Sequence, residues 1–342
     1  MKILAFESSC DDTCVAVVED GRRVLSSCVS SQTDTHALYG GVVPEIASRM
    51  HTEAISRLCR NALDNAGLTL ADVDAVAVTY APGLIGALLV GLSFAKSLAA
   101  TLGVPLIPVH HVRAHVAAAY LAFPELEPPF VALACSGGTT AFIHVEDYTK
   151  FRFLGGTKDD AAGEAFDKVG RCLGLTYPAG AAMDRLAAGG NDRAYEFPRP
   201  SFADAPLDCS FSGLKTAVIN TVHNLQQKGL EPSVPDLCAS FCRTVSDMLV
   251  PRLLKAAELT GCTTVCVGGG VAANSVLRRD LERACAAAGL RLCIPPLKYC
   301  GDNAAMVGAL GYYEYLAGHT AGPDLNAYAT MSLSTEEKQY YK

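Results

Sequence analysis

The alternation of apolar and polar positions along the chain predicts two successive sets of strands and helices. In the first set, the expected strands span 2–8, 14–19, 24–31, 73–80 and 104–109, and the expected helices span 44–66 and 84–102. Asp20-Gly21 is a hairpin signal between two of these strands, and the polar stretch from 32 to 41 is expected to be a loop. The second set opens in the same way, with strands at 130–135, 139–146, 150–154, 263–267 and 290–294 and helices at 159–173, 178–188, 212–227, 234–259, 271–288 and 302–316. This recurrence indicates a duplicated α/β fold.

The length of 342 residues suggests two domains. We expect an N-terminal half at 1–125, joined by part of the C-terminal segment at about 319–342. The C-terminal half is expected at 126–318, with a helical insertion at about 175–260. In such a pair, a ligand is expected in the cleft between the halves, where tight turns face each other.

Composition restricts the class of protein. Residues of the chain are 50% hydrophobic and 18% charged, and this hydrophobic share is ample for large cores. The net charge of -7 makes the protein a poor generic binder of nucleic acid unless it has a local basic patch or a helper protein. The 14 cysteines include no C-x-x-C pair, and Met1-Lys2 leads directly into an apolar strand without a signal peptide, so we expect free thiols in a reducing cytoplasm. Residues 75–95 carry no charge, but Pro82-Gly83 interrupts them, which favours a strand, a turn and a helix over a membrane span.

Three of the 8 histidines lie in the segment His110-His-Val-Arg-Ala-His115. If this segment is helical, His111 and His115 are one turn apart on the same face and can bind one metal ion. The alternative is that these histidines are packed or solvated and bind nothing. Val112 stands where a zinc protease of the H-E-x-x-H type carries its glutamate, so the segment supplies ligands but no protease base.

Carboxylates and glycine turns are the other candidates for a ligand site. Asp160, Glu164 and Asp167 are expected on one helix face, and Asp302 can either cap the last helix or complete a His-His-Asp metal site. The turns at 8–13, 136–140 and 268–270 leave backbone N–H groups free to surround an anion, which favours a phosphate or nucleotide site. Neither a P-loop nor a GxGxxG motif is present.

Eight motifs occur in order along the chain, and together they are highly specific. They are Glu7-Ser-Ser-Cys-Asp-Asp-Thr13, Gly40-Gly-Val-Val-Pro-Glu-Ile-Ala-Ser-Arg49, Ala81-Pro-Gly-Leu-Ile-Gly-Ala-Leu88, His110-His-Val-Arg-Ala-His115, Asp159-Asp-Ala-Ala-Gly-Glu-Ala-Phe-Asp-Lys168, Phe211-Ser-Gly-Leu-Lys-Thr216, Gly269-Gly-Val-Ala-Ala-Asn274 and Gly301-Asp-Asn303. From Ile3 to about Leu316, the chain closely resembles the tRNA N6-threonylcarbamoyladenosine transferase family, formerly called O-sialoglycoprotein endopeptidase.

The resemblance implies a fold of the actin/Hsp70/sugar-kinase type with two ribonuclease-H-like halves. It implies transfer of a threonylcarbamoyl group from threonylcarbamoyl-AMP to N6 of the adenosine 3′ of the anticodon in tRNAs reading ANN codons, with release of AMP. One divalent metal ion per chain, Fe2+ or Zn2+, would be bound by His111, His115 and Asp302. The positions that match the family's substrate-binding residues are Ala134, Cys135, Ser136, Gly137, Gly138, Asp167, Gly180, Asp184 and Asn274. Asp11 or Asp12 could accept the proton from N6.

The family also implies partners, namely tRNA, a degenerate homologue that pairs through the first half, and a small ATPase. We expect the helix at 84–102 and the helix from Pro44 to form the surface for the homologue. The chain departs from the family pattern at Thr139, at Ala179 and Ala181, at Asp12 and at Gly301, and none of these changes removes a ligand. The competing interpretations are an ATP-dependent phosphotransferase of the same superfamily, which would not need the histidine pair, and a non-catalytic scaffold, which would be expected to lack it.

Overall fold

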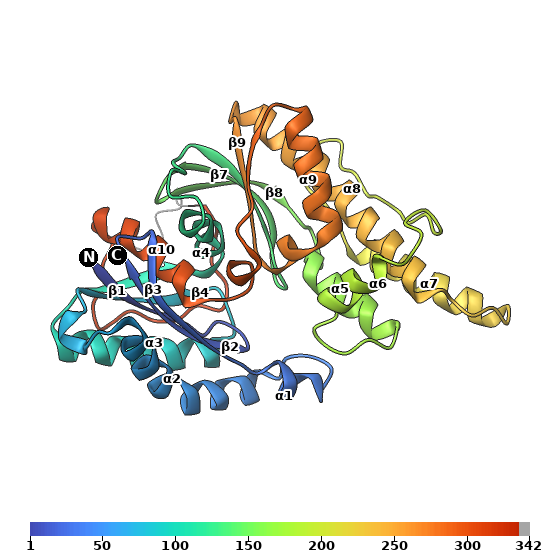
Figure 1. Cartoon of the computed structure of the whole chain (residues 1–342). Coiled ribbons are helices and arrows are strands. Elements are labelled where there is room, and N and C mark those ends of the chain that lie inside the picture. The colour runs from blue at the N-terminus through green and yellow to red at the C-terminus, as the bar shows by residue number, and fades with distance from the viewer. Residues whose placement is uncertain (335–342) are drawn as a thin grey trace. The chain divides into compact units, whose positions relative to one another are not determined.

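The computed structural model describes residues 1–334, and the chain divides into two compact units. The first unit comprises Met1–Pro128, Val145–Arg152 and the C-terminal segment from Pro295. The second unit comprises Pro129–His144 and Phe153–Ile294. Figure 1 labels most of the helices and strands of both units.

The first unit is built on a five-stranded sheet with the strand order β3-β2-β1-β4-β5. β1 pairs antiparallel with β2, and β2 pairs antiparallel with β3, whereas β4 and β5 extend the sheet in parallel from β1. The strands span Lys2–Glu7 (β1), Asp12–Glu19 (β2), Arg23–Ser31 (β3), Ala75–Ala81 (β4) and Leu106–His110 (β5). All seven residues of β4 are buried, because helices cover both faces of this sheet.

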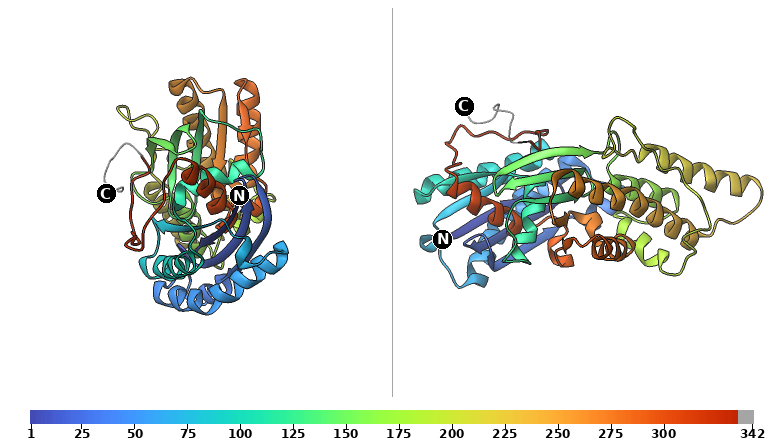
Figure 2. Two further views of the ribbon diagram at one scale, coloured as in Figure 1. Left: turned by 90° about the vertical axis from the view of Figure 1, so that its left-hand side faces the viewer. Right: turned by 90° about the horizontal axis from the view of Figure 1, so that it is seen from above.

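Helices α2 and α3 lie side by side on one face of the first sheet, and α10 lies on the other (Figures 1 and 2). The helices of the first unit are α1 (Thr33–Ala37), α2 (Pro44–Ala66), α3 (Ile85–Leu102), α4 (His111–Ala117) and α10 (Ala304–Leu316), with 3-10 turns η1 (Leu70–Asp72), η2 (Ala118–Leu121) and η4 (Leu297–Tyr299). Pro44 opens α2, and Gly67 ends it with a left-handed φ of 65°, so both ends are set by local sequence. The apolar face of α2 packs on β2, β3 and α3.

The second unit repeats the arrangement of the first sheet. Its strand order is β10-β9-β6-β7-β8, in which β6 takes the place of β1 and β9 the place of β4. The strands span Phe130–Cys135 (β6), Thr140–Asp147 (β7), Lys150–Gly156 (β8), Thr264–Gly268 (β9) and Arg291–Cys293 (β10). The helices are α5 (Ala162–Cys172), α6 (Gly180–Ala187), α7 (Ser212–Gln227), α8 (Val234–Thr260) and α9 (Ser275–Ala287), with a 3-10 turn η3 (Gly270–Ala273). The same strand order in both sheets confirms the predicted duplication.

The last helix belongs to the first unit, whereas the sequence-based division placed 295–318 in the second half. α10 packs directly on the first sheet through glycines that leave room for it. A Cβ atom at Gly308 would lie 2.6 Å from a methyl carbon of Val18, and one at Gly311 would lie 2.9 Å from the Cβ of Ala77. Close backbone approach of this kind tolerates no larger residue.

Other differences from the predicted elements are local. The stretch expected to be a loop before Pro44 contains the short helix α1, of which only His36 is buried. The helix expected at 271–288 begins as the turn η3 and becomes α9 at Ser275. Asp20 and Gly21 both have positive φ, of 51° and 67°, as the predicted hairpin signal requires.

Among residues 1–334, α3 is the one helix that is long and apolar enough to cross a membrane by length and composition. Its mean hydropathy is 1.7, and 33% of it is buried. In the structure α3 packs against α2 and β4, which is the strand–turn–helix arrangement expected from the break at Pro82-Gly83.

Residues 319–334, here named the C-terminal strap, follow α10 back along the first unit. Ala321 forms an antiparallel bridge with Leu106, and the backbone N–H of Tyr328 donates to the carbonyl of Tyr80. The guanidinium of the buried Arg113, on α4, donates to the backbone carbonyls of Ser332, Leu333 and Ser334. The strap therefore fastens the end of the described chain to the helix that carries the two histidines.

Candidate metal centre

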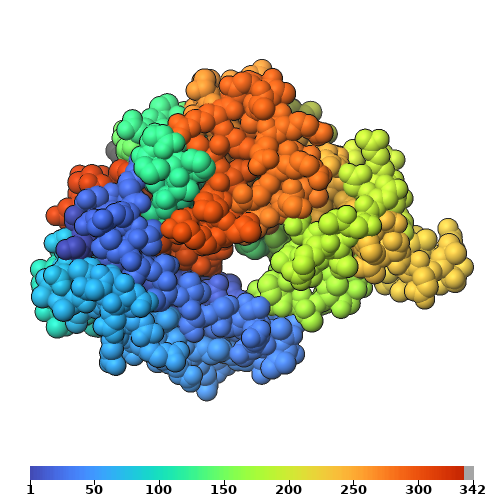
Figure 3. All heavy atoms as spheres, viewed as in Figure 1, coloured from blue at the N-terminus to red at the C-terminus, as the bar shows by residue number. Residues whose placement is uncertain are grey.

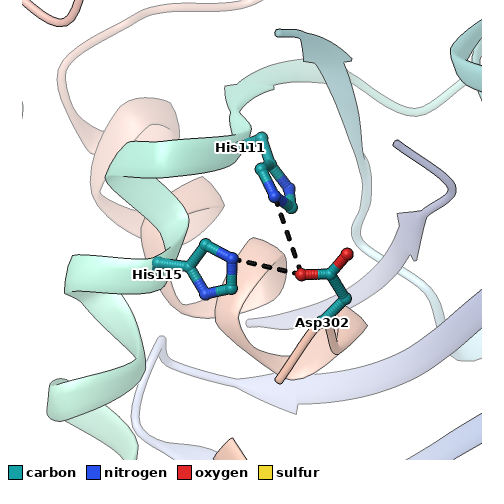
Figure 4. A group of neighbouring side chains, drawn as sticks. All are labelled: His111, His115 and Asp302. Carbon is teal, nitrogen blue, oxygen red and sulfur yellow. Dashed lines mark ion pairs between the residues drawn. The ribbon is translucent and has the colours of Figure 1, made fainter. Parts of the chain in front are cut away.

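The two histidines predicted to share a helix face do so. β5 ends at His110, and α4 begins with His111, so His111 and His115 are one turn apart with ring centroids separated by 4.7 Å. The side chain of His110 caps this helix by accepting from the backbone N–H of Arg113. Figure 4 shows both rings projecting from α4 toward Asp302.

Asp302 faces the histidines and does not cap α10. The N-cap is Asn303, whose side chain accepts from the backbone N–H of Met306 at 2.9 Å. Oδ1 of Asp302 lies 3.1 Å from Nε2 of His115 and 3.6 Å from Nε2 of His111. One ligand atom from each of the three residues falls within 4.8 Å of the others, which is close enough to hold a single metal ion.

The donor set suits a divalent transition metal. Two imidazole nitrogens and a carboxylate oxygen are ligands that zinc and ferrous iron accept. His115 is buried, and its Nδ1 has no hydrogen-bond partner among residues 1–334, whereas its Nε2 points at Oδ1 of Asp302, 3.1 Å away. A cation between Nε2 and Oδ1 would satisfy both of these polar atoms.

A buried carboxylate supports the first histidine. Oε2 of Glu7 lies 3.0 Å from Nδ1 of His111, and the hydroxyl of Ser9 lies 3.1 Å from the same nitrogen. Glu7 is itself held, because it accepts from the hydroxyl of Thr79 and the backbone N–H of Ser9, both at 2.5 Å. With Nδ1 directed at Glu7, Nε2 is the nitrogen that faces Asp302. Glu7 was not among the predicted site residues, and its one signal in the sequence is an acid at the end of an apolar strand.

The charges of Glu7, His111, His115 and Asp302 shift the pKa values of His111 and Asp302. Burial alone would lower the pKa of His111, but Glu7 and Asp302 outweigh burial and raise this pKa to about 9. Burial would raise the pKa of Asp302, and the nearby His111 and His115 instead bring it down to about 2. The site therefore favours ionised carboxylates around a positive centre.

The turn between β1 and β2 brings two further carboxylates to the first unit. Asp11 lies in this turn, and Asp12 is the first residue of β2. Burial raises the pKa of Asp12 to about 6, a hydrogen bond with Ser31 opposes the shift, and the charges of Asp302, Asp11 and Glu7 add to it. Oδ1 of Asp12 is buried and has no hydrogen-bond partner among residues 1–334. Asp12 is thus a carboxyl group that can bind or release a proton near neutral pH.

Two of the three predicted ligand turns lie together in the second unit. The turn at Ser136–Gly138 closes with a hydrogen bond from the backbone N–H of Ser136 to the carbonyl of Thr139. A Cβ atom at Gly269 would lie 2.3 Å from the carbonyl oxygen of Cys135, so the β9–η3 turn touches the end of β6. The backbone N–H of Gly163, in the first turn of α5, donates to the carbonyl of Ser136. Glycine backbone from three elements therefore converges there, and a Cβ atom at Gly137 or at Gly138 would point into open space.

The remaining predicted substrate-binding residues lie on α5, α6 and α9 of the second unit. Asp167 accepts from the backbone N–H of Ala179, next to Gly180, and Asp184 accepts from the backbone N–H and hydroxyl of Ser275. Asn274 caps α9. These side chains join the helices in the structure, and the expectation that they contact a ligand stays a prediction. Ala134 and Cys135 are the buried last residues of β6.

The expectation of an acidic helix face at Asp160, Glu164 and Asp167 is wrong in one member. α5 begins at Ala162, so Asp160 precedes the helix. Asp160 instead pairs with Lys168 at 3.1 Å and with Lys215 at 2.9 Å, which ties the start of α5 to α7.

The fold has relatives among solved structures. HypF from T. kodakarensis matches with a TM-score of 0.64 and 15% identity over 93% of this chain and 48% of that one. A ROK family protein from Streptococcus pneumoniae TIGR4 matches with a TM-score of 0.53 and 13% identity over 93% and 99% of the two chains. These structural similarities are evidence for the fold alone, and they confirm the expected fold of the actin/Hsp70/sugar-kinase type.

Sequence relatives are much closer. A tRNA N6-adenosine threonylcarbamoyltransferase from Moorella thermoacetica is 52% identical over 332 residues, which cover 97% of each chain. A relative of the same name from Clostridium botulinum (strain 657 / Type Ba4) is 49% identical over 333 residues, which cover 97% of this chain and 98% of the relative. The TsaD family model, described as tRNA N6-adenosine threonylcarbamoyltransferase, matches residues 23–309. With this match and identities near one half over almost the whole length, the chain belongs to the tRNA N6-adenosine threonylcarbamoyltransferase family.

Proposed function

We propose that this enzyme transfers the threonylcarbamoyl group from threonylcarbamoyl-AMP to N6 of the adenosine 3′ of the anticodon in tRNAs that read ANN codons. In this reaction the bond between the carbamoyl carbon and the phosphate oxygen breaks, a bond from N6 to that carbon forms, and AMP leaves with the electron pair. N6 must also lose a proton. The observation that carries the proposal is a His-His-Asp cluster supported by the buried Glu7, in a chain of this family.

His111, His115 and Asp302 would hold one divalent ion per chain, Fe2+ or Zn2+. When bound, such an ion supplies a Lewis acid that orients and polarises oxygen ligands. Glu7 and Ser9 would fix the ring of His111 through its Nδ1, so that the other nitrogen stays available as a ligand.

Asp12 would accept the proton from N6, and Asp11 is the second candidate for this role. A general base works best when its pKa is near the working pH, and burial raises the pKa of Asp12 to about 6. Oδ1 of Asp12 is buried and lacks a hydrogen-bond partner within residues 1–334, so this oxygen has unused capacity to accept a proton. Supporting this assignment, the carboxyl sits at the start of a strand that is paired on both sides.

The second unit would bind the adenylate part of the donor. Backbone N–H groups of Gly137 and Gly138, next to Ser136, would surround the phosphate, where developing negative charge needs donors. Asp167 and Asp184 would contact the ribose hydroxyls, and Gly180 and Asn274, with Ala134 and Cys135 behind them, would shape the rest of the site.

The enzyme would act in the cytoplasm with helper proteins. Its net charge of -7 disfavours unaided binding to tRNA. A degenerate homologue would pair with the first unit, where α1 and the segment after it expose Leu38 (83%) and Tyr39 (61%), and α3 exposes Ile85 and Leu89. Figure 3 shows the blue and light-blue residues of α1 and α2 on the surface of the first unit. A small ATPase would complete the complex.

The test is a transfer assay with tRNA and threonylcarbamoyl-AMP, run with this chain alone, with the helpers, and after metal removal. We expect multiple turnover only with the helpers and with metal restored. Elemental analysis should find one metal per chain, lost in H111A and in H115A. ATP hydrolysis without carbamoyl transfer would favour the phosphotransferase alternative. Sustained turnover by the isolated chain, unchanged by partners, would refute the need for helpers, and full metal occupancy in both variants would refute the metal centre.

A further inference from the structure

The turn between β1 and β2 carries Asp11 and leads into Asp12, the first residue of β2, and residues 8–11 have no regular structure of their own to hold them. Several backbone bonds fix its edges. The backbone N–H of Leu84 donates to the carbonyl of Ser9 at 2.8 Å, and that of Gln32 donates to the carbonyl of Asp11 at 3.1 Å. The backbone carbonyl of Cys10 lies between these two bonded carbonyls and can accept a further hydrogen bond.

His51 provides that attachment from α2. Its side chain is fully buried, Nε2 lies 2.9 Å from the carbonyl oxygen of Cys10, and Nδ1 lies 2.7 Å from the hydroxyl oxygen of Thr13. These two partners stand on either side of Asp11 and Asp12 in the chain. One imidazole ring therefore bridges the turn across both carboxylates.

The partners also define the tautomer. A carbonyl oxygen only accepts, so Nε2 of His51 must donate to Cys10. Burial lowers the pKa of His51, which keeps the ring neutral near pH 7, and Nδ1 is then an acceptor for the hydroxyl of Thr13. Both polar atoms of the ring are used, and both are used on the same turn.

A buried histidine can also contribute only packing to a core. The rest of the buried face of α2 is apolar, with Ala47, Ala54, Ile55 and Leu58 around His51. An apolar residue would therefore fit the helix face, and a histidine there carries a desolvation cost that only its bonds to the turn offset. The 23-residue helix, packed on β2, β3 and α3, gives the ring a rigid base.

We propose that His51 is a positioning residue for the transfer reaction, which holds the backbone from Cys10 to Thr13 so that the carboxylates of Asp11 and Asp12 keep their places. This inference rests on the role proposed above for Asp12. His51 itself touches neither the three candidate metal ligands nor Glu7 through any hydrogen bond in the described structure.

Three variants separate positioning from packing. H51L keeps the bulk of the side chain and removes both bonds to the turn. H51Q restores a donor for Cys10 and an acceptor for Thr13, because a glutamine amide has one of each. T13V removes one of the two bonds from the side of the turn. T52A is the matched control, since Thr52 follows His51 on α2, is exposed and bonds to Ser48 in its own helix.

The measurements are kcat and KM for transfer to tRNA with the helpers present, the metal content of each protein and its thermal unfolding temperature. A displacement of about 1 Å at a reacting group costs on the order of a hundredfold in rate. We expect kcat of H51L to fall by about ten- to a hundredfold with KM within about twofold of wild type, and metal content to stay unchanged. H51Q should regain most of kcat, T13V should lie between them, and T52A should match wild type.

A double variant with D12N tests whether His51 acts on the reaction through the turn and Asp12. If His51 acts through the turn, H51L/D12N is no slower than D12N alone, because residues that act as a unit are not additive. Wild-type kcat in H51L, H51Q as slow as H51L, a loss of metal in proportion to the loss of rate, or additive losses in the double variant would each overturn the positioning role. A fully active D12N refutes the role of Asp12 and leaves the comparison of H51L with H51Q to decide the positioning role by itself.

Discussion

Substitution of Glu7 by glutamine should weaken metal binding without changing any proposed ligand. Glu7 is buried, and its Oε2 lies 3.0 Å from Nδ1 of His111. E7Q keeps the shape of the side chain and an oxygen that can accept a hydrogen bond, but it removes the negative charge. A buried carboxylate beside a ligating histidine fixes the ring and makes its other nitrogen a better donor to the metal.

The size of the effect follows from the kind of hydrogen bond that is lost. A bond to a charged acceptor contributes about 1.5–3 kcal/mol, and a neutral one about 0.5–1.5 kcal/mol. The exchange therefore costs on the order of 1–2 kcal/mol, which is about a five- to thirtyfold rise in Kd. This range overlaps the ten- to hundredfold loss of metal affinity that is typical when such outer partners are removed.

The assay is competition for Zn2+ against a chromophoric chelator of known affinity, at fixed pH and ionic strength. E45Q is the matched control, because Glu45 is an exposed acid of the same unit that pairs with Arg49 on its own helix. Kd should rise in E7Q and stay unchanged in E45Q, with similar unfolding temperatures for both. An E7Q protein that binds zinc as tightly as wild type would show that Glu7 contributes nothing to the orientation of His111.

Further predictions concern groups away from the ligands. Burial raises the pKa of Asp12 to about 6, and a general base must be ionised to act, so kcat should fall as pH decreases through about 6. D12N should be slow, and its kcat should depend less on pH. An unchanged dependence of kcat on pH in D12N would contradict the role of Asp12 as the base. All 14 cysteines are free in the structure, so thiol titration under denaturing, non-reducing conditions should give close to 14, and several native disulfides would contradict it. A hydrogen bond that His319 donates to the carboxylate of Glu314 raises the pKa of His319 above 6.5, so this pair stabilises the fold below that pH and loses its effect as pH rises through the raised pKa. H319A should therefore lower the unfolding temperature at pH 6 more than at pH 9, and equal losses at both would exclude a charged pair.

Local patterns in the sequence were enough to predict most of the fold. Runs such as Ile3–Phe6 are buried on both faces and therefore apolar throughout, and α2 has a proline at its start and a glycine at its end. The helix α1 was missed because it has five residues and buries only His36, so no apolar stripe marks it. The placement of α10 was wrong because Gly308 and Gly311 indicate close packing but do not name the strands that receive it.

In the candidate site too, local patterns predicted only the residues that are close in sequence. His111 and His115 are four residues apart, so helix geometry alone predicts that they share a face. Asp302 lies nearly 190 residues further on, and the choice between cap and ligand depended on Asn303 taking the cap, which only the fold decides. Glu7 was missed as a partner of His111 for the same reason, since 104 residues separate them. Contacts distant in sequence are set by topology, and spacing carries no information about them.

The first unit contains segments from both ends of the chain, so the ribosome completes this unit only when synthesis ends. β1 to β5 emerge within the first 110 residues, but α10, which covers one face of their sheet, and Asp302 emerge only after the whole second unit has been made. Until then, one apolar face of the first sheet lacks its permanent cover, and nascent chains with exposed strands of this kind are prone to aggregate or to engage chaperones. The second unit, by contrast, has all of its strands by Cys293 and can close its own core first. We therefore expect the two units to fold in the reverse of their order in the gene, with the three proposed metal ligands assembled as one of the last events of maturation.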